Sequence, residues 1–243
     1  MVASLASAVS DVDYVQECIV EEVQAKRTIF GELARLSEAQ ALLCSSASAL
    51  LPDDFLEGSA CQRSIVAHPF NPCYLLPAVE LVPSRWTSMQ TIDRVSRVLR
   101  SVGLSPVVMR KPIFGYIGNR LQAAVMDEAM ALIADGAATP DELDAVMTGA
   151  LGPRWALSGP FETMDLNAPG GIAEYTKKYA AAYAALGESL ECGKAWTTEA
   201  LETVIASRRA HVPVLDLPVR ARNRDAALAQ LCAALDRIAF VRK

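Results

Sequence analysis

The chain has 243 residues, of which 52% are hydrophobic and 21% are charged, and its formal net charge at pH 7 is −5. This is the composition of a globular protein with enough apolar material for one large domain or two small ones. The lysines and arginines are scattered along the chain, which excludes nucleic acid as an expected partner.

Short apolar runs that end in turn residues recur through the first half of the chain. Helical patterns lie between some of them, over residues 21–35 and 92–101. Strands that alternate with helices predict an α/β layer with a mostly parallel sheet. The predicted strands are Tyr14–Val20, Ala41–Cys44, Ser64–Ala67, Val79–Val82 and Pro106–Met109.

The pattern changes near residue 111 and is helical from there on. A long helix is predicted over 113–134, and Thr139 followed by Pro140 has the residues of a helix start. Further helices are predicted over 172–186, 197–209 and 219–238. We therefore predict two domains, a sheet domain over 1–110 and an all-helical domain over 111–243.

The cysteines and the apolar runs indicate the cellular compartment in which the protein is expected. The six cysteines are widely spaced and include no C-x-x-C pair, which favours reduced thiols and predicts no metal site. The first ten residues lack lysine and arginine, and no run reaches about 18 apolar residues, so we expect neither a signal peptide nor a membrane span. A cytoplasmic protein is the resulting expectation.

Two titratable residues stand out in the sheet domain. His68 ends an apolar run and precedes Pro69, so its imidazole is expected near the carboxyl ends of the strands, where such sheets bind ligands. Glu80 is the only charge within Val79–Val82, and a buried carboxylate requires a partner. An imidazole is one such partner. The alternative is that Glu80 pairs with an arginine while His68 only ends its strand.

Four segments together resemble the L-3-hydroxyacyl-CoA dehydrogenase superfamily. His68-Pro-Phe-Asn-Pro with Glu80 is similar to its catalytic His–Glu segment. Ser45-Ser-Ala-Ser48 resembles its Ser-Asn-Thr-Ser turn, and Gly115-Tyr-Ile-Gly-Asn119-Arg-Leu resembles its Gly-Phe-x-x-Asn-Arg-Leu. Glu17-Cys-Ile-Val-Glu21 followed by Lys26 resembles its Glu-Ala-x-x-Glu and later lysine. The resemblance covers about residues 5–187.

The resemblance implies NAD as cofactor and hydride transfer as the reaction. It places His68 as general base on a substrate 3-hydroxyl and Glu80 as the group that orients it. Ser48 and Asn119 are expected to hydrogen-bond the substrate oxygen or the imidazole. The residues expected to touch NAD are Glu21, Lys26 and Ser46.

Within the superfamily, the segments around His68 and Glu80 are most similar to the lambda-crystallin and L-gulonate 3-dehydrogenase branch. Gly152-Pro-Arg154-Trp-Ala and the segment 159–167 strengthen that choice. Arg154 is expected to bind the carboxylate of a small hydroxy acid; alternatively it is a solvated loop residue or a dimer contact. The resemblance further implies a homodimer formed through the helical domain.

The chain departs from the superfamily in one respect. It contains no Gly-x-Gly-x-x-Gly turn before its strands, so we expect a truncated Rossmann-type domain that starts after the first mononucleotide half. Such a fragment or degenerate paralogue is expected to bind NAD weakly. Two other functions stay open, a 3-hydroxyacyl-CoA dehydrogenase of fatty-acid oxidation and a non-catalytic structural or partner-binding protein.

Overall fold

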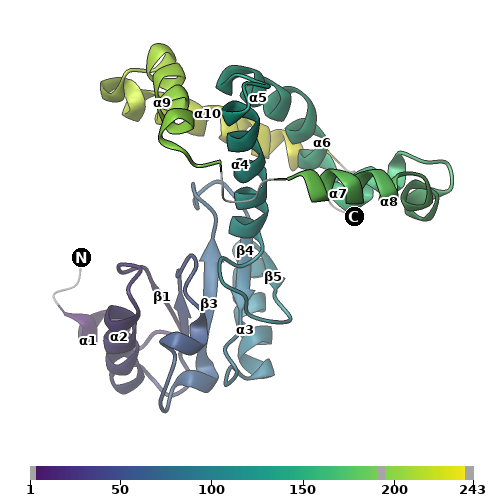
Figure 1. Cartoon of the computed structure of the whole chain (residues 1–243). Coiled ribbons are helices and arrows are strands. Elements are labelled where there is room, and N and C mark those ends of the chain that lie inside the picture. The colour runs from purple at the N-terminus through teal and green to yellow at the C-terminus, as the bar shows by residue number, and fades with distance from the viewer. Residues whose placement is uncertain (1–3, 191–194, 239–243) are drawn as a thin grey trace. The chain divides into compact units, whose positions relative to one another are not determined.

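A computed structural model describes residues 4–190 and 195–238 (Figure 1). The chain forms two compact units, residues 1–121 and 122–243. The first contains the sheet, and the second consists of helices and their connections. The boundary expected near residue 110 lies before a loop that belongs to the first unit, because Tyr116 in this loop is part of that unit's buried core.

The first unit is built on a five-stranded sheet in the order β1-β2-β3-β4-β5. Strands β1, β2 and β3 are parallel, β4 is antiparallel to β3, and β5 is parallel to β4. The predicted α/β class with a mostly parallel sheet is therefore confirmed. The strands are β1 (Tyr14–Glu17), β2 (Leu42–Ser45), β3 (Ser64–Pro69), β4 (Ala78–Val82) and β5 (Ser105–Val108).

The antiparallel step between β3 and β4 follows from a short connection. Only residues 70–77 join the two strands. A parallel pair needs a crossover of about a dozen residues or more, so this link permits only a return in the opposite direction. The resulting register pairs Val66 with Val82 and His68 with Glu80.

Helices cover both faces of the sheet. Helix α2 (Val23–Leu36) packs Phe30 and Leu33 in one core cluster, which also includes short helix α1 (Leu5–Val9). Helix α3 (Met89–Ser101) packs against the opposite face. Side chains alternate along each strand. Residues 42, 65 and 81 therefore point to α3, whereas 43, 66 and 82 point to α2.

Two of the differences between the predicted and the observed bounds bear on the site. The strand expected over 14–20 ends at Glu17, and Ile19 and Val20 beyond it are exposed. The helix expected from Ile113 starts only at Gly118, because Gly115 and Tyr116 adopt left-handed backbone angles, with φ of 75° and 52°. A helix cannot pass through such residues.

The second unit begins within α4 (Gly118–Ala134). The predicted start at Thr139 is confirmed, because Thr139 and Glu142 form a reciprocal capping box. No described helix of either unit is both long and apolar enough to cross a membrane. The remaining helices are α5 (Pro140–Val146), a π-helical turn (Met147–Leu151), α6 (Gly152–Leu157), α7 (Pro160–Leu166), α8 (Gly171–Ser189), α9 (Thr198–His211) and α10 (Leu217–Leu235).

Candidate active site

His68 and Glu80 form a buried pair at the carboxyl end of β3. His68 Nδ1 lies 2.9 Å from Glu80 Oε2, and the two residues are 6% and 2% exposed. A carboxylate can only accept a hydrogen bond, so Nδ1 carries a proton, and in the neutral imidazole the lone pair is then on Nε2. The alternative was an arginine as the partner of Glu80, and within residues 4–190 and 195–238 no such contact is present. The other hydrogen bonds that Glu80 accepts there come from backbone N–H groups.

The second carboxylate oxygen of Glu80 accepts hydrogen bonds from the backbone at the start of helix α4. Oε1 accepts the backbone N–H groups of Ile117 and Gly118, at 2.8 and 2.9 Å. Helix N-termini carry unpaired N–H groups and partial positive charge, which favour a carboxylate. Glu80 therefore reaches three donors from its buried position, and it fixes both the His68 tautomer and the place where α4 begins.

Two aromatic rings flank the His68 imidazole. The Phe70 ring lies 5.2 Å away between centroids, and the Tyr116 ring lies 5.5 Å away in an edge-on arrangement. Tyr116 is fully buried, and burial, followed by the charges of Glu21 and Glu80, raises the pKa of its hydroxyl above the usual value. These rings limit His68 to one orientation.

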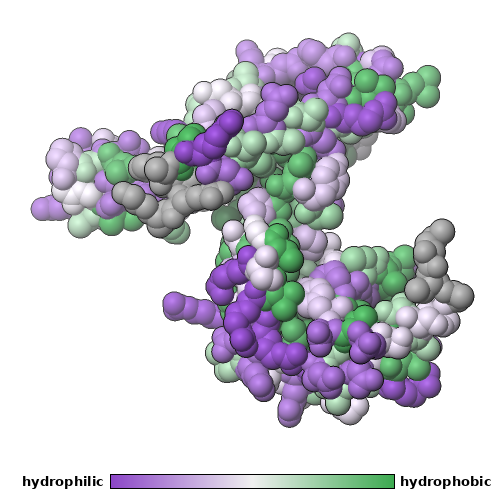
Figure 2. All heavy atoms as spheres, turned by 180° about the vertical axis from the view of Figure 1, so that it is seen from behind, coloured by the Kyte–Doolittle hydropathy of each residue, from purple (hydrophilic) through white to green (hydrophobic). Residues whose placement is uncertain are grey.

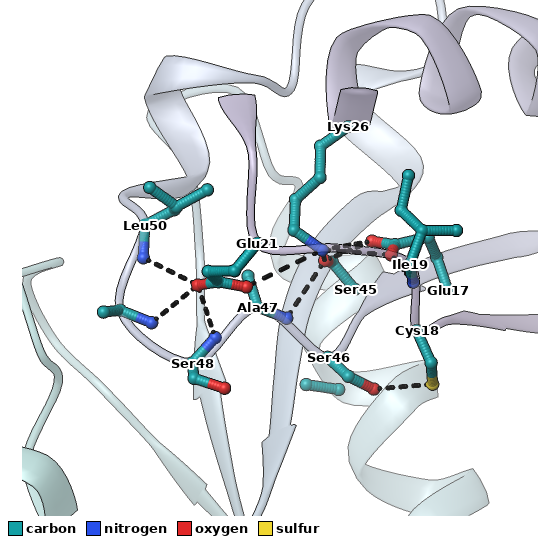
Figure 3. Close-up of polar contacts among 12 residues, drawn as sticks. Glu17, Cys18, Ile19, Glu21, Lys26, Ser45, Ser46, Ala47, Ser48 and Leu50 are labelled. Carbon is teal, nitrogen blue, oxygen red and sulfur yellow. Dashed lines mark hydrogen bonds and ion pairs between the residues drawn. The ribbon is translucent and has the colours of Figure 1, made fainter. Parts of the chain in front are cut away.

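The loop that follows β2 carries Ser46 and Ser48 and is bound by Glu21. Glu21 Oε1 accepts the backbone N–H groups of Ser48, Ala49 and Leu50, at 2.8, 2.9 and 3.2 Å (Figure 3). Three converging N–H groups form an anion-binding nest, here occupied by the protein's own carboxylate. Glu21 thus fixes the loop.

Lys26, which was expected to touch NAD, lies in the interior. Its ammonium is 3.0 Å from both carboxylate oxygens of Glu17, and the two side chains are 1% and 2% exposed. Ser45 Oγ also donates to Glu17, at 2.6 Å. Lys26 is therefore linked to the loop after β2 in two ways: through Glu17, which also binds Ser45, and through Glu21, whose Oε2 lies 3.9 Å from the Lys26 ammonium (Figure 3).

Ser46, the third residue expected at the cofactor, lies at the carboxyl ends of β1 and β2. Its hydroxyl accepts from Gln16 Nε2 at 2.7 Å and lies 3.1 Å from the Cys18 sulfur. Figure 3 shows the Ser46–Cys18 contact beside the buried Lys26–Glu17 pair. The three residues expected at NAD are thus close together, but Lys26 is beneath the surface.

Ser48 and Asn119 lie together, joined by a hydrogen bond from the Asn119 side chain to the Ser48 backbone. Asn119 Nδ2 donates to the carbonyl oxygen of Ser48 at 2.7 Å. Ser48 itself is exposed, and among the described residues its Oγ makes no hydrogen bond. Arg154 belongs to the second unit, where it lies on α6 and is exposed.

Several residues of the site carried little signal in the sequence. Glu17 and Tyr116 lie within motifs of the resemblance that imply no role for them, and Gln16 lies outside those motifs. Gly118 is a further example: a β-carbon at this position would overlap the Phe70 ring. Its position inside a Gly-x-x-Gly run was the only available hint.

We expect Gly118→Ala to destabilise the first unit by about 1–3 kcal/mol, the usual cost of overpacking. The added methyl must displace Phe70 or the first turn of α4, and that turn donates to Glu80. Urea unfolding measures the effect. Gly31→Ala is the matched control, because it lies in α2 with open space around it; an equal loss in both variants would contradict the packing role of Gly118.

NAD is the cofactor that the resemblance implies, and the polar groups at the carboxyl ends of β1 and β2 are the residues available to it. The described site offers an exposed edge at the ends of β1 and β2, with the Ser46 hydroxyl, the Glu21 carboxylate and backbone groups next to His68. Hydroxyl, carboxylate and backbone groups are of the kind that bind the polar parts of NAD. The turn that would bind the pyrophosphate is not present in the 243 residues.

Two family profiles cover most of the chain. Residues 1–112 match 3-hydroxyacyl-CoA dehydrogenase, NAD binding domain. Residues 115–205 match 3-hydroxyacyl-CoA dehydrogenase, C-terminal domain. The division between them falls in the loop before α4.

Known sequences agree with these profiles. Lambda-crystallin of Oryctolagus cuniculus is 45% identical over 177 residues, which are 72% of this chain and 55% of that protein. L-carnitine dehydrogenase of Bacillus cereus (strain ZK / E33L) is 42% identical over 165 residues, 67% of this chain and 50% of that protein. The chain spans about half the length of these relatives.

Solved structures show the same fold. The 3-hydroxyacyl-CoA dehydrogenase of Archaeoglobus fulgidus superposes with a TM-score of 0.65 at 29% identity, over 82% of this chain and 67% of that one. A 5-formyl-3-hydroxy-2-methylpyridine 4-carboxylic acid 5-dehydrogenase superposes with a TM-score of 0.83 at 24% identity. The match covers 97% of this chain and 77% of that one.

Proposed function

The chain belongs to the 3-hydroxyacyl-CoA dehydrogenase family, and we propose that it provides the catalytic part of an NAD-dependent dehydrogenase acting on a small L-3-hydroxy acid. The observation that carries this proposal is the buried His68–Glu80 pair, with Nδ1 bound to the carboxylate and Nε2 left as a base. NAD, when bound, accepts the hydride from the substrate carbon.

In the proposed reaction, His68 Nε2 removes the proton from the substrate hydroxyl. Glu80 then stabilises the imidazolium and keeps its orientation. The Glu80 carboxylate suits this role because its other oxygen is already held by two backbone donors, so it need not move when His68 gains charge. In the reverse direction, His68 returns the same proton.

Ser48 and Asn119 are proposed to contact the substrate near its reacting carbon. Support comes from their connection, Asn119 to the Ser48 carbonyl, which leaves the exposed Ser48 hydroxyl for a ligand. We further propose that Arg154 binds the substrate carboxylate. Among the described residues its guanidinium forms no ion pair, and a guanidinium matches a carboxylate bidentately.

Substrate class is tested with the purified chain and with a fusion that adds a Gly-x-Gly-x-x-Gly half from a family member before residue 1. NADH binding is titrated by fluorescence, and turnover of L-gulonate, L-carnitine and acetoacetyl-CoA is followed by NADH absorbance. We expect turnover of a small hydroxy acid. Turnover of acetoacetyl-CoA alone would favour the fatty-acid enzyme, and a folded fusion that binds NADH without any turnover would favour a non-catalytic role.

Cysteine labelling tests the proposed position of the cofactor without any turnover. Cys18 is exposed and contacts Ser46, so bound NADH is expected to slow its alkylation. Cys44 is fully buried, and burial raises the pKa of its thiol to about 12, so it stays unreactive at pH 8. Cys232 on α10 is the reference thiol. NADH binding without any protection of Cys18 would contradict this position.

We also propose that the helical unit pairs with a second copy. Helices α6, α7, α8 and α10 bury no residue among those described, whereas Phe161, Leu166 and Leu186 are 74%, 62% and 59% exposed. On the face drawn in Figure 2, hydrophobic side chains are exposed among hydrophilic ones. Exposed apolar area of this kind favours association. Sedimentation equilibrium tests it: a monomer at micromolar concentration would contradict the proposal.

A further inference from the structure

The loop of Ser48, Ala49 and Leu50 is bound on both sides of its backbone. All three N–H groups point to Glu21 Oε1, as described above. The three carbonyl oxygens accept from the segment before and at the start of α4. Ser48 accepts from Asn119 Nδ2 at 2.7 Å, Ala49 from the Gly115 N–H at 3.4 Å, and Leu50 from the Tyr116 hydroxyl at 2.6 Å.

Tyr116 makes the shortest of these carbonyl contacts, and it does so from a constrained backbone. Its φ of 52° lies in the left-handed region, which is uncommon for a residue with a side chain, and Gly115 before it also has a positive φ. This pair of residues turns the chain so that the next two N–H groups, of Ile117 and Gly118, reach Glu80. The surrounding contacts therefore maintain the conformation.

The Tyr116 side chain connects both halves of the site. Its ring packs against the His68 imidazole in a T-shaped arrangement, and its hydroxyl reaches the loop that carries Ser48. A phenyl ring alone would preserve the first contact and lose the second. The hydroxyl is thus the group that ties the position of the loop to the position of His68.

We propose that the Tyr116 hydroxyl is a positioning group that holds the 48–50 loop at a fixed place relative to His68. The inference rests on the proposed function, since it assigns the loop to the substrate side of the reaction. In the proposed reaction, Tyr116 takes no part in the transfer of the proton or of the hydride. It acts through Leu50 on the loop and through its ring on His68.

Tyr116→Phe tests the proposal, because it removes one oxygen and keeps the ring. Hydrogen exchange of the Ser48–Leu50 amides is the first readout, and we expect it to accelerate about five-fold, the typical effect of one hydrogen bond. Exchange in β3 serves as the internal reference and should not change. In whichever form is active, the chain or the fusion, kcat for the hydroxy acid is expected to fall by a similar factor with little change in KM.

Tyr183→Phe is the matched control. It removes a hydroxyl that is hydrogen-bonded at 2.9 Å to Tyr175 on α8, and it should alter neither readout. Unchanged amide exchange in Tyr116→Phe would overturn the proposal, as would faster exchange with unchanged kcat. If neither the chain nor the NADH-binding fusion turns over a hydroxy acid, the proposed function fails, while the exchange comparison still decides whether the hydroxyl holds the loop.

Discussion

His68→Gln is expected to lower turnover by about two to four powers of ten, the usual contribution of a general base. Glutamine preserves a hydrogen bond to Glu80 but offers no group that takes up a proton near neutral pH. Substrate and cofactor contacts from the other residues remain. The measurement is kcat, in the chain or the fusion that shows activity, with KM and NADH affinity determined in parallel.

His211→Gln is the matched control for this variant. His211 ends α9, its side chain is 54% exposed, and its ring contacts the Ser207 carbonyl oxygen. We expect this variant to keep normal turnover. Near-normal turnover in His68→Gln, with the unfolding midpoint unchanged, would rule out His68 as the base.

Lys26→Met is expected to lower the free energy of unfolding by about 3–5 kcal/mol, as found when one member of a buried ion pair is removed. The change leaves the Glu17 carboxylate, 5% exposed as a residue, without its cation. Its remaining donors are the Ser45 hydroxyl and the Ile19 N–H. Urea unfolding at pH 7 measures the loss.

The double variant Glu17→Gln/Lys26→Met shows how much of this loss comes from the unpaired charge of Glu17. We expect it to be more stable than Lys26→Met, because no uncompensated charge stays buried. Arg85→Met is the control, since the Arg85 side chain is 66% exposed in its pair with Asp53 and such pairs contribute at most about 1 kcal/mol. A loss in Lys26→Met no larger than in this control would show that the buried pair does not stabilise the fold.

The strand pattern and the helical second half followed from periodicity, because the core residues alternate along strands and recur along helices. The pairing of His68 with Glu80 was also accessible, since a lone carboxylate in an apolar strand needs a partner. The antiparallel return that brings them face to face depends on residues 70–77, and the strand pattern alone carries no direction.

The interior position of Lys26 was not accessible from sequence. A lysine in the first turn of a helix normally reaches solvent, and nothing local indicates that Glu17, nine residues earlier, takes its ammonium. Periodicity likewise extended helix α4 back to Ile113, because the apolar spacing continues there. The left-handed angles at Gly115 and Tyr116 depend on tertiary contacts to Leu50 and Glu80.

The position of β4 between β3 and β5 constrains which insertions and deletions the protein tolerates. Side chains along a strand alternate between faces, so one residue inserted between 78 and 80 would turn Glu80 to the α3 side, away from His68. β4 is paired along both edges and has no free side on which to slip. Length variation among homologues should therefore accumulate after Phe70, in residues 71–77, and be absent from the strand that carries Glu80.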